Sequence, residues 1–368
     1  MLISGRFSPD RSNQDAGFFA QCVSHHAIDL SLGRIKEELE YLLKDVTSSV
    51  EAQFPRLCQD SGSTISVAFV LPGKGVVSAW IGDSEILVFK KGCDEVSRVF
   101  VNEKHQIASK SEREKIKVRA EDHQLHYSMS RSHLRLHAFA PGLALSESIG
   151  DKFLEPLKGK AISSHEMPFD ESEAYRVCVA SDGLSKVVDL LPGYIKKQGR
   201  GGAQKVIDRS IMQARNEYAE DDDIAAFLLE VSSRESQTNE AVLMMVADGH
   251  GDLGHLVAEK VVRLLRQKFP DFLASTGFKC DQWSAFEPLG KMGGKQRSCR
   301  VSGSIQSGNE RVKFSQEERE MPCFTAHCNF SRTQKKKLVE GLASCGQFAC
   351  HQEGEGAAAL QQKLEVNV

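Results

Sequence analysis

Apolar and polar positions alternate along the chain in patterns that predict both strands and helices. Residues 61–99 are rich in Val, Ile and aromatic residues, and the turn at 71–75 predicts a hairpin. Residues 32–54 and 203–218 have helical spacing, whereas 175–180 and 224–231 read as buried strands. Residues 102–137 are charged and predict an exposed helix followed by a loop. This mixture predicts an α/β sandwich rather than a strict βαβ alternation.

A late segment combines a strand, a glycine-rich turn and a helix. The apolar run 242–246 leads into Asp248-Gly249-His250-Gly251, and an amphipathic helix follows. Carboxylate oxygens suit hard cations such as Mg²⁺ or Mn²⁺, and the flanking glycines allow the backbone to come close to an ion. The pattern therefore predicts a site for a divalent cation at the end of this strand.

Composition indicates an ordinary soluble protein of 368 residues with a net charge of −3. The charge balance favours neither nucleic acid nor a membrane surface as a partner, and no apolar run approaches the ~20 residues that span a bilayer. Ten cysteines without a secretory signal predict reduced thiols in the cytoplasm or nucleus. We expect a monomer.

The chain changes character after residue 278. Gly, Ser, Gln, Lys and Arg dominate residues 279–320, which predicts a loosely ordered or linker-like stretch, with short helical patterns at 332–342 and 357–364. A zinc site in this tail is an alternative, although the Cys-x4-Cys spacing is unusual for zinc. Its candidate ligands are Cys323, His327, Cys328, Cys345, Cys350 and His351.

Several acidic residues stand beside Gly or Ser at predicted strand ends, namely Asp83, Asp151, Asp182 and Asp222. One such residue is usually only a turn. A series of them can converge from several strands and hold two hard cations, which together activate water for an in-line displacement at phosphorus.

The order of the motifs over residues 1–232 resembles the PPM family, the metal-dependent type 2C protein serine/threonine phosphatases. The motifs are RSNQDA, SGST, WIGDSEILVF, APGLALSESIGDK, VASDGLSKVV and EDDDIAAFLLEV. The resemblance implies a four-layer α/β/β/α sandwich. It also implies hydrolysis of phosphoserine and phosphothreonine in phosphorylated protein substrates, by water activated between two Mg²⁺ or Mn²⁺ ions.

The resemblance also assigns roles to individual residues. Asp182 and Asp222 would be metal ligands, Asp15 would order a water molecule at the metals, and Arg11 would grip the substrate phosphate. Asp83 and Asp151 would anchor turns near the site.

Two positions depart from the family pattern. Val23 stands where the family carries its metal-bridging Asp, and Lys186 stands near where many relatives carry another acidic residue. Since valine cannot ligate a cation, the first departure leaves the site incomplete.

Three interpretations of the late Asp-Gly-His-Gly remain open. Residues 233–275 could be a partial second copy of the domain, followed by a tail over 276–368. Alternatively, the late strand could enter the first domain and supply Asp248 and the carbonyl of Gly249 as ligands, which would require displacement of residues 17–45. The third interpretation is a pseudophosphatase that binds phosphoproteins without hydrolysing them.

Overall fold

The computed structural model describes fourteen stretches of the chain and divides it into two units, residues 1–327 and 328–368. The described residues are 2–8, 14–24, 30–92, 95–120, 126–130, 133–137, 143–155, 157–198, 202–217, 222–231, 240–292, 295–303, 315–319 and 323–327. Arg11, the second unit and hence the two helical patterns expected there lie outside them. So does most of the candidate zinc cluster.

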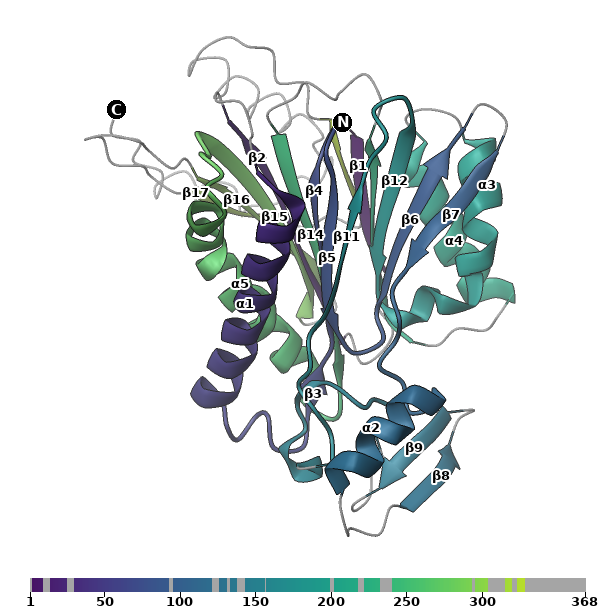
Figure 1. Ribbon diagram of the computed structural model, residues 1–368, viewed down its shortest axis with the longest axis vertical. Helices are drawn as coiled ribbons and strands as arrows, with labels where there is room; N and C mark the ends of the chain where they lie inside the picture. Colours follow the sequence, from purple (N-terminus) through teal and green to yellow (C-terminus); the bar gives the residue numbers. More distant parts are fainter. Residues whose placement is uncertain are drawn as a thin grey trace, which may run out of the picture. The chain divides into compact units, whose positions relative to one another are not determined.

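Two antiparallel sheets form the centre of the first unit (Figure 1). One sheet has the strand order β18 (Cys323–His327), β1 (Leu2–Ser8), β13 (Ile224–Val231), β12 (Ala174–Ala180), β6 (Glu85–Lys91) and β7 (Val96–Val101). The main path of the other runs β11 (Ser163–Pro168), β5 (Gly75–Ile81), β4 (Ile65–Leu71), β14 (Glu240–His250), β2 (Asp15–Val23), β15 (Gln282–Met292), β16 (Lys295–Gly303) and β17 (Ser315–Arg319). The short strands β3 (Gly62–Ser63) and β10 (Ile149–Gly150) pair beside it.

Helices cover the outer face of each sheet (Figure 1). Helices α1 (Leu32–Gln53) and α5 (Gly254–Thr276) lie on the sheet that contains β14. The 3-10 helix η2 (Asp182–Leu190), α3 (Leu191–Lys197) and α4 (Ala203–Glu217) lie on the other. Along β14, Met244 and Val246 point into the apolar layer between the sheets, whereas Leu243 and Met245 point toward α1 and α5. This alternation confirms the expected four-layer sandwich.

Most elements begin and end close to where the apolar pattern predicts them. Helix α1 begins after Ser31, whose hydroxyl accepts a hydrogen bond from the backbone N–H of Arg34 at 3.2 Å. Strands β4 and β5 form the predicted hairpin. The second strand expected in this hairpin is instead two strands, β5 and β6. The chain turns between them at Gly82, whose φ is +102°, and β6 joins the other sheet.

The region 102–137 contains the predicted exposed helix, α2 (Lys110–Ala120). The loop expected after it contains a two-stranded hairpin of β8 (His126–Ser130) and β9 (His133–His137). Farther along, the short 3-10 helix η1 (Lys152–Leu154) follows β10.

Strand β14 lies between β2 and β4 in the sheet, and α5 packs beside α1 (Figure 1). Residues 240–276 are thus part of the same sandwich as the first motifs. The displacement of residues 17–45 that this arrangement was expected to require does not occur, since β2 and α1 are both in place.

The expectation that Val23 occupies the metal-bridging position is corrected by the strand register. Val23 is the last residue of β2 and lies opposite Glu240, the first residue of β14. Asp15 is the first residue of β2 and lies opposite Asp248. Eight residues of extended chain, at about 3.3 Å each, separate Val23 from the carboxylates.

Part of the stretch that composition marks as linker-like is made of strands. The backbone N–H of Asp281 donates to the carbonyl of Val23 at 3.0 Å, and β15 then continues along β2. Strands β16 and β17 add to β15 in turn. Backbone hydrogen bonds to an open sheet edge organise this segment, which its side-chain composition does not reveal.

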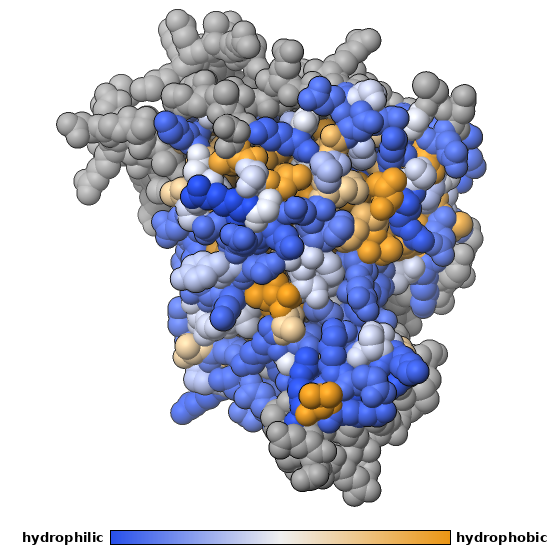
Figure 2. All heavy atoms as spheres, viewed as in Figure 1, coloured by the Kyte–Doolittle hydropathy of each residue, from blue (hydrophilic) through white to orange (hydrophobic). Residues whose placement is uncertain are grey.

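None of the helices within the described residues is long and apolar enough to cross a membrane. The face of the molecule in Figure 2 is mainly hydrophilic, with separate apolar areas among the polar residues.

Candidate metal centre

One end of the sandwich brings acidic residues together from both sheets. Strand β2 starts there with Asp15, and β14 ends there with Asp248 as its Cα partner. In the other sheet, Ala180 at the end of β12 pairs with Ala226 near the start of β13. This pairing places Asp182, which follows β12, and Asp223, which precedes β13, at the same end.

Strand alternation directs these side chains inward. Asp15 lies on the same face of β2 as Phe19, and Asp248 lies on the same face of β14 as Val246, because residues an even number of positions apart share a strand face. Phe19 and Val246 both face the layer between the sheets. Asp15 is only 6% exposed and Asp223 only 2% exposed. The carboxylates therefore meet between the sheets rather than on the outer helix layers.

Burial and mutual repulsion disfavour the charged forms of three of these groups. Burial, followed by the charges of Asp223 and Asp222, raises the pKa of Asp15 to about 8, and the nearby side chains of Ser181 and Asp248 offset part of this increase. Burial and neighbouring carboxylates also raise the pKa of Asp182 and of Asp248 well above the usual range. These carboxyl groups therefore favour their neutral forms until a cation compensates their charge.

Unpartnered oxygens mark the same place. Among the residues that the structure describes, none makes a hydrogen bond of normal geometry to the buried carboxylate oxygens of Asp15 or to the buried Oδ1 of Asp182. Buried polar atoms usually form hydrogen bonds, so buried oxygens that lack them indicate a site for a bound ligand. All of the donors are hard oxygens, which fit Mg²⁺ or Mn²⁺.

The carboxylate cluster is not a preformed metal-binding site. Among the residues that the structure describes, no three acidic, imidazole or thiolate side chains stand close enough together to hold an ion as they are placed. A cation that bound here would have to draw the carboxylates together, and it would remove their mutual repulsion in doing so.

Gln14 holds the turn that carries Asp248. Its backbone N–H donates to Oδ2 of Asp223, and its carbonyl accepts from the N–H of Gly249 at 3.1 Å. Its side-chain amide donates to the carbonyl of Gly251 at 2.9 Å. A side chain at position 249 would collide with the backbone of Gly254, so the turn requires glycine there.

Asp83 and Asp222 add charge to the cluster from its edges. The Gln106 amide donates to Oδ2 of Asp83 at 2.8 Å, and among the neighbouring charges Asp83 is the largest contributor to the raised pKa of Asp182. Asp222 is exposed, and its Oδ1 accepts from the N–H of Asp223 at 2.9 Å. Asp222 therefore faces solvent at the mouth of the cluster.

Asp151 belongs to a different contact, with the imidazole of the late turn. Its Oδ2 accepts from Ser148 Oγ at 2.6 Å and lies 2.6 Å from His250 Nε2. Burial opposes ionisation of Asp151, but His250, Ser148 and Lys158 outweigh it and hold the pKa of this carboxyl below its usual range. Asp151 thus fixes the ring two residues beyond Asp248.

Lys104 lies near the cluster, whereas Lys186 is close to it in sequence. Lys104 Nζ is 2.5 Å from Glu85 Oε1 and donates to Ser185 Oγ at 2.7 Å, and its charge lowers the pKa of Asp182 in part. Lys186 is exposed on η2, four residues after Asp182.

The raised pKa of Asp15 predicts how the metal-free protein responds to pH. Between about pH 4 and about pH 8 the folded state keeps a proton that the unfolded chain has released, so the free energy of unfolding should fall as the pH rises. Urea denaturation in EDTA at about pH 5, 6.5 and 8 measures this slope. Asp15→Asn should make the slope shallower; an identical slope in the variant would contradict the prediction.

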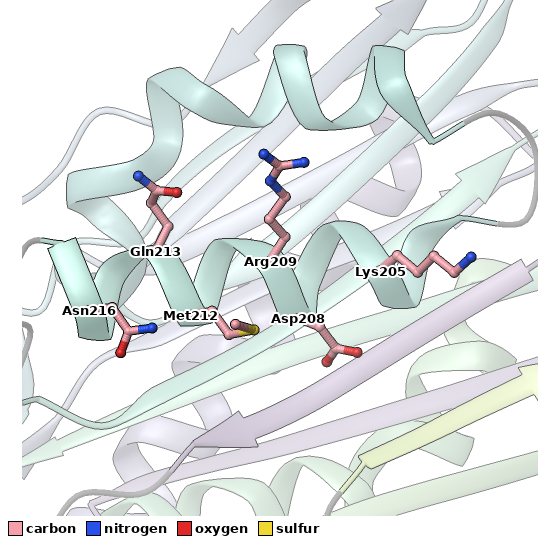
Figure 3. Close-up of a pocket in the computed structure, with 6 residues that line it drawn as sticks. All are labelled: Lys205, Asp208, Arg209, Met212, Gln213 and Asn216. Atoms are coloured by element: carbon pink, nitrogen blue, oxygen red, sulfur yellow. The ribbon is translucent and has the colours of Figure 1, made fainter.

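A separate hollow of about 370 Å³ lies on the outer helix layer, over α4 (Figure 3). Its lining residues all come from that helix: Lys205, Asp208, Arg209, Met212, Gln213 and Asn216. Arg209 is stacked over the Tyr194 ring, with Cζ 4.7 Å from the centroid, and the Tyr194 hydroxyl donates to Gln213 Oε1 at 2.9 Å. These contacts are those of a solvated helix face.

The family of the chain follows from comparison with known proteins. The sequence model of the family described as Protein phosphatase 2C matches residues 13–222, which is more than half of the chain. The protein therefore belongs to the protein phosphatase 2C family, whose members are the PPM serine/threonine phosphatases. No curated protein matches the chain.

Several solved structures are similar to this one at low sequence identity. Serine-threonine phosphatase 2C from Toxoplasma gondii is 15% identical, with a TM-score of 0.47 over 63% of this chain and 95% of that one. The phosphatase Stp1 from Staphylococcus aureus is 13% identical, with a TM-score of 0.40 over 63% and 96%. The phosphatase PstP from Mycobacterium tuberculosis is 14% identical, with a TM-score of 0.35 over 67% and 99%.

Some residues that organise this end of the sandwich are not among those that the motifs predict. Gln14 and Asp223 adjoin the predicted site residues Asp15 and Asp222, so their motifs contained the signal. The link between His250 and Asp151 joins residues 99 positions apart, and no local pattern reveals it.

Proposed function

We propose that this protein is a phosphatase that depends on Mg²⁺ or Mn²⁺ and hydrolyses phosphoserine and phosphothreonine in protein substrates. The observation that carries the proposal is a set of buried carboxylate oxygens, of Asp15 and Asp182 beside Asp248, to which no described residue makes a hydrogen bond of normal geometry. Membership of the protein phosphatase 2C family supports the same chemistry.

Asp182, Asp222 and Asp248 would hold two cations, together with the carbonyl of Gly249. When bound, the metals would neutralise the phosphate and activate a water molecule for attack at phosphorus. Asp15 would accept a hydrogen bond from that water and orient it, because its oxygens have no partner of normal geometry within the described part of the chain. Arg11 is the proposed group for gripping the substrate phosphate.

His250 is placed to act on the leaving group. Its Nε2 is paired with the Asp151 carboxylate, its side chain is 24% exposed, and it lies two residues beyond Asp248. An imidazole held by a carboxylate can carry a proton and pass it to a departing serine or threonine oxygen. The pair therefore offers a general acid that does not depend on a metal.

The alternative of a pseudophosphatase rested on Val23, which the strand register places at the far end of β2. We therefore favour hydrolysis. Action as a monomer in the cytoplasm or nucleus stays a prediction.

Phosphate release from a panel of phosphopeptides tests the proposal. Full-length protein with Mn²⁺ or Mg²⁺ should hydrolyse phosphoserine and phosphothreonine peptides, and EDTA should abolish the reaction because the carboxylates alone cannot activate water. Re-addition of Mn²⁺ should restore it. A rate that persists in protein shown to be metal-free by elemental analysis would overturn the mechanism, and absence of any metal-stimulated hydrolysis would overturn the function.

A further inference from the structure

Thr64 lies where the ladder beside β14 is interrupted. Strand β4 pairs with β14 as far as Val246 opposite Ser66, and β3 pairs with it from Gly249 opposite Ser63. Thr64 stands between β3 and β4, and Asp248 lies between the two paired stretches of β14. Asp248 therefore pairs with Asp15 of β2 on one side, but on the other side it falls outside the registers of both β3 and β4.

Two hydrogen bonds between Thr64 and Asp248 bridge this interruption. The backbone N–H of Thr64 donates to the carbonyl of Asp248 at 2.8 Å. The N–H of Asp248 donates to Oγ1 of Thr64 at 3.2 Å, so a side-chain hydroxyl replaces the missing backbone acceptor. Both backbone groups of Asp248 are thus held by one residue.

The Thr64 hydroxyl is itself fixed by a second buried hydroxyl. Thr64 Oγ1 and Ser84 Oγ are 2.7 Å apart, and the two residues are 1% and 0% exposed. The carbonyl of Ser84 accepts from the Asn102 amide at 2.9 Å and from Ser66 Oγ at 3.1 Å. These contacts leave the Thr64 hydroxyl little freedom to turn away from Asp248.

Close packing at Gly82 makes this contact attainable. A Cβ at position 82 would lie 2.6 Å from Cβ of Thr64 and 2.5 Å from its Cγ2, and φ at this residue is +102°. The turn that carries Asp83 and Ser84 therefore passes directly against Thr64. The hydroxyl pair joins the Asp83 turn to Asp248, two parts of the carboxylate cluster that lie far apart in sequence.

We propose that Thr64 is a positioning residue for divalent-cation binding, which it supports by fixing the backbone of Asp248 through its hydroxyl and that of Ser84. The inference rests on the proposed function, because it assigns Asp248 to the metal site. The clustered carboxylates repel one another, so a turn without this anchor would relax away from Asp15 and Asp182. Loss of comparable supporting contacts weakens metal binding by about 10–100-fold.

Calorimetric titration of the full-length protein with Mn²⁺ tests the proposal. Thr64→Val keeps the shape but removes the hydroxyl, and it should weaken binding by about 10–100-fold. Thr64→Ser keeps the hydroxyl and should bind within about threefold of the wild type. Thr47→Val is the matched control, because this buried hydroxyl donates to the Leu43 carbonyl within α1 and should affect stability alone.

The outcomes separate this inference from the proposed function. A wild-type protein that binds no Mn²⁺ would remove the metal site and the role of Thr64 together. Wild-type binding that Thr64→Val leaves unchanged would overturn the positioning role only, as would an equal loss in Thr64→Ser or Thr47→Val. If Thr64→Val fails to fold, Ser84→Ala should weaken Mn²⁺ binding in the same direction by a smaller factor, and unchanged binding in that variant would overturn the role.

Discussion

Asp248→Asn is expected to abolish metal-dependent hydrolysis while leaving the metal-free protein folded. The substitution keeps the shape of the side chain but removes the charge that a cation needs at the end of β14. Metal ions supply several kcal/mol of charge stabilisation in such reactions, and a loss of about 4 kcal/mol lowers the rate by about 10³-fold. Mn²⁺ titration and phosphate release from a phosphothreonine peptide measure the two effects.

Asp248→Asn should not destabilise the metal-free folded protein. Burial and the neighbouring acids Asp15 and Asp182 oppose the charge of Asp248 in the metal-free state, so its removal should not lower the thermal midpoint in EDTA. Asp252→Asn is the matched control, since Asp252 is exposed and lies four residues farther along, in the turn after β14. Full activity in Asp248→Asn would show that Asp248 holds no metal, and an equal loss in Asp252→Asn would show that the effect is not specific to Asp248.

A double variant tests whether position 23 or position 248 carries the metal-bridging carboxylate. If position 23 were the bridging one, an aspartate placed there by Val23→Asp would compensate for the loss of Asp248. The register places Val23 at the other end of β2, so the double variant with Asp248→Asn should remain as inactive as the single one.

Phe269→Ala should produce the largest loss of stability among these variants, because it opens a cavity where α5 meets the sheet. The ring is fully buried, and it packs edge-on against Phe18 of β2 with 6.0 Å between the ring centroids. Removal of a buried phenylalanine ring costs about 3–5 kcal/mol. Urea denaturation followed by circular dichroism measures the change, which should appear in one cooperative transition.

Two comparisons make this result specific. Tyr41→Ala on the exposed face of α1, where the side chain is 69% exposed, should change the free energy of unfolding by less than about 0.5 kcal/mol. Phe18→Ala combined with Phe269→Ala should show a coupling of about 0.5–1.5 kcal/mol, because the rings touch. Additive effects with two separate transitions would instead identify residues 233–275 as an independent copy.

Local patterns accounted for most of the individual elements. The spacing of apolar residues predicted α1, α4 and the strands β12 and β13 close to their observed bounds, because helices and strands bury residues with different periods. It did not predict that β5 and β6 belong to different sheets, since the separating turn depends on the positive φ of Gly82. Nor did it predict β15 to β17, because composition marks residues 279–320 as linker-like, whereas backbone pairing along β2 and between these strands orders them.

The sequence by itself determined the family and identified the acidic residues at strand ends, because the motifs and their order are carried by adjacent residues. Only the tertiary structure decided that β14 enters the sheet between β2 and β4, with Asp248 opposite Asp15 and Val23 far from both. Strand order depends on backbone hydrogen bonds and apolar burial between residues more than 170 positions apart. A comparison of motifs along the chain assumes that the strands follow one another in a fixed order. In the folded protein, a strand from any part of the chain can occupy a position in the sheet if its apolar side chains face the two apolar layers.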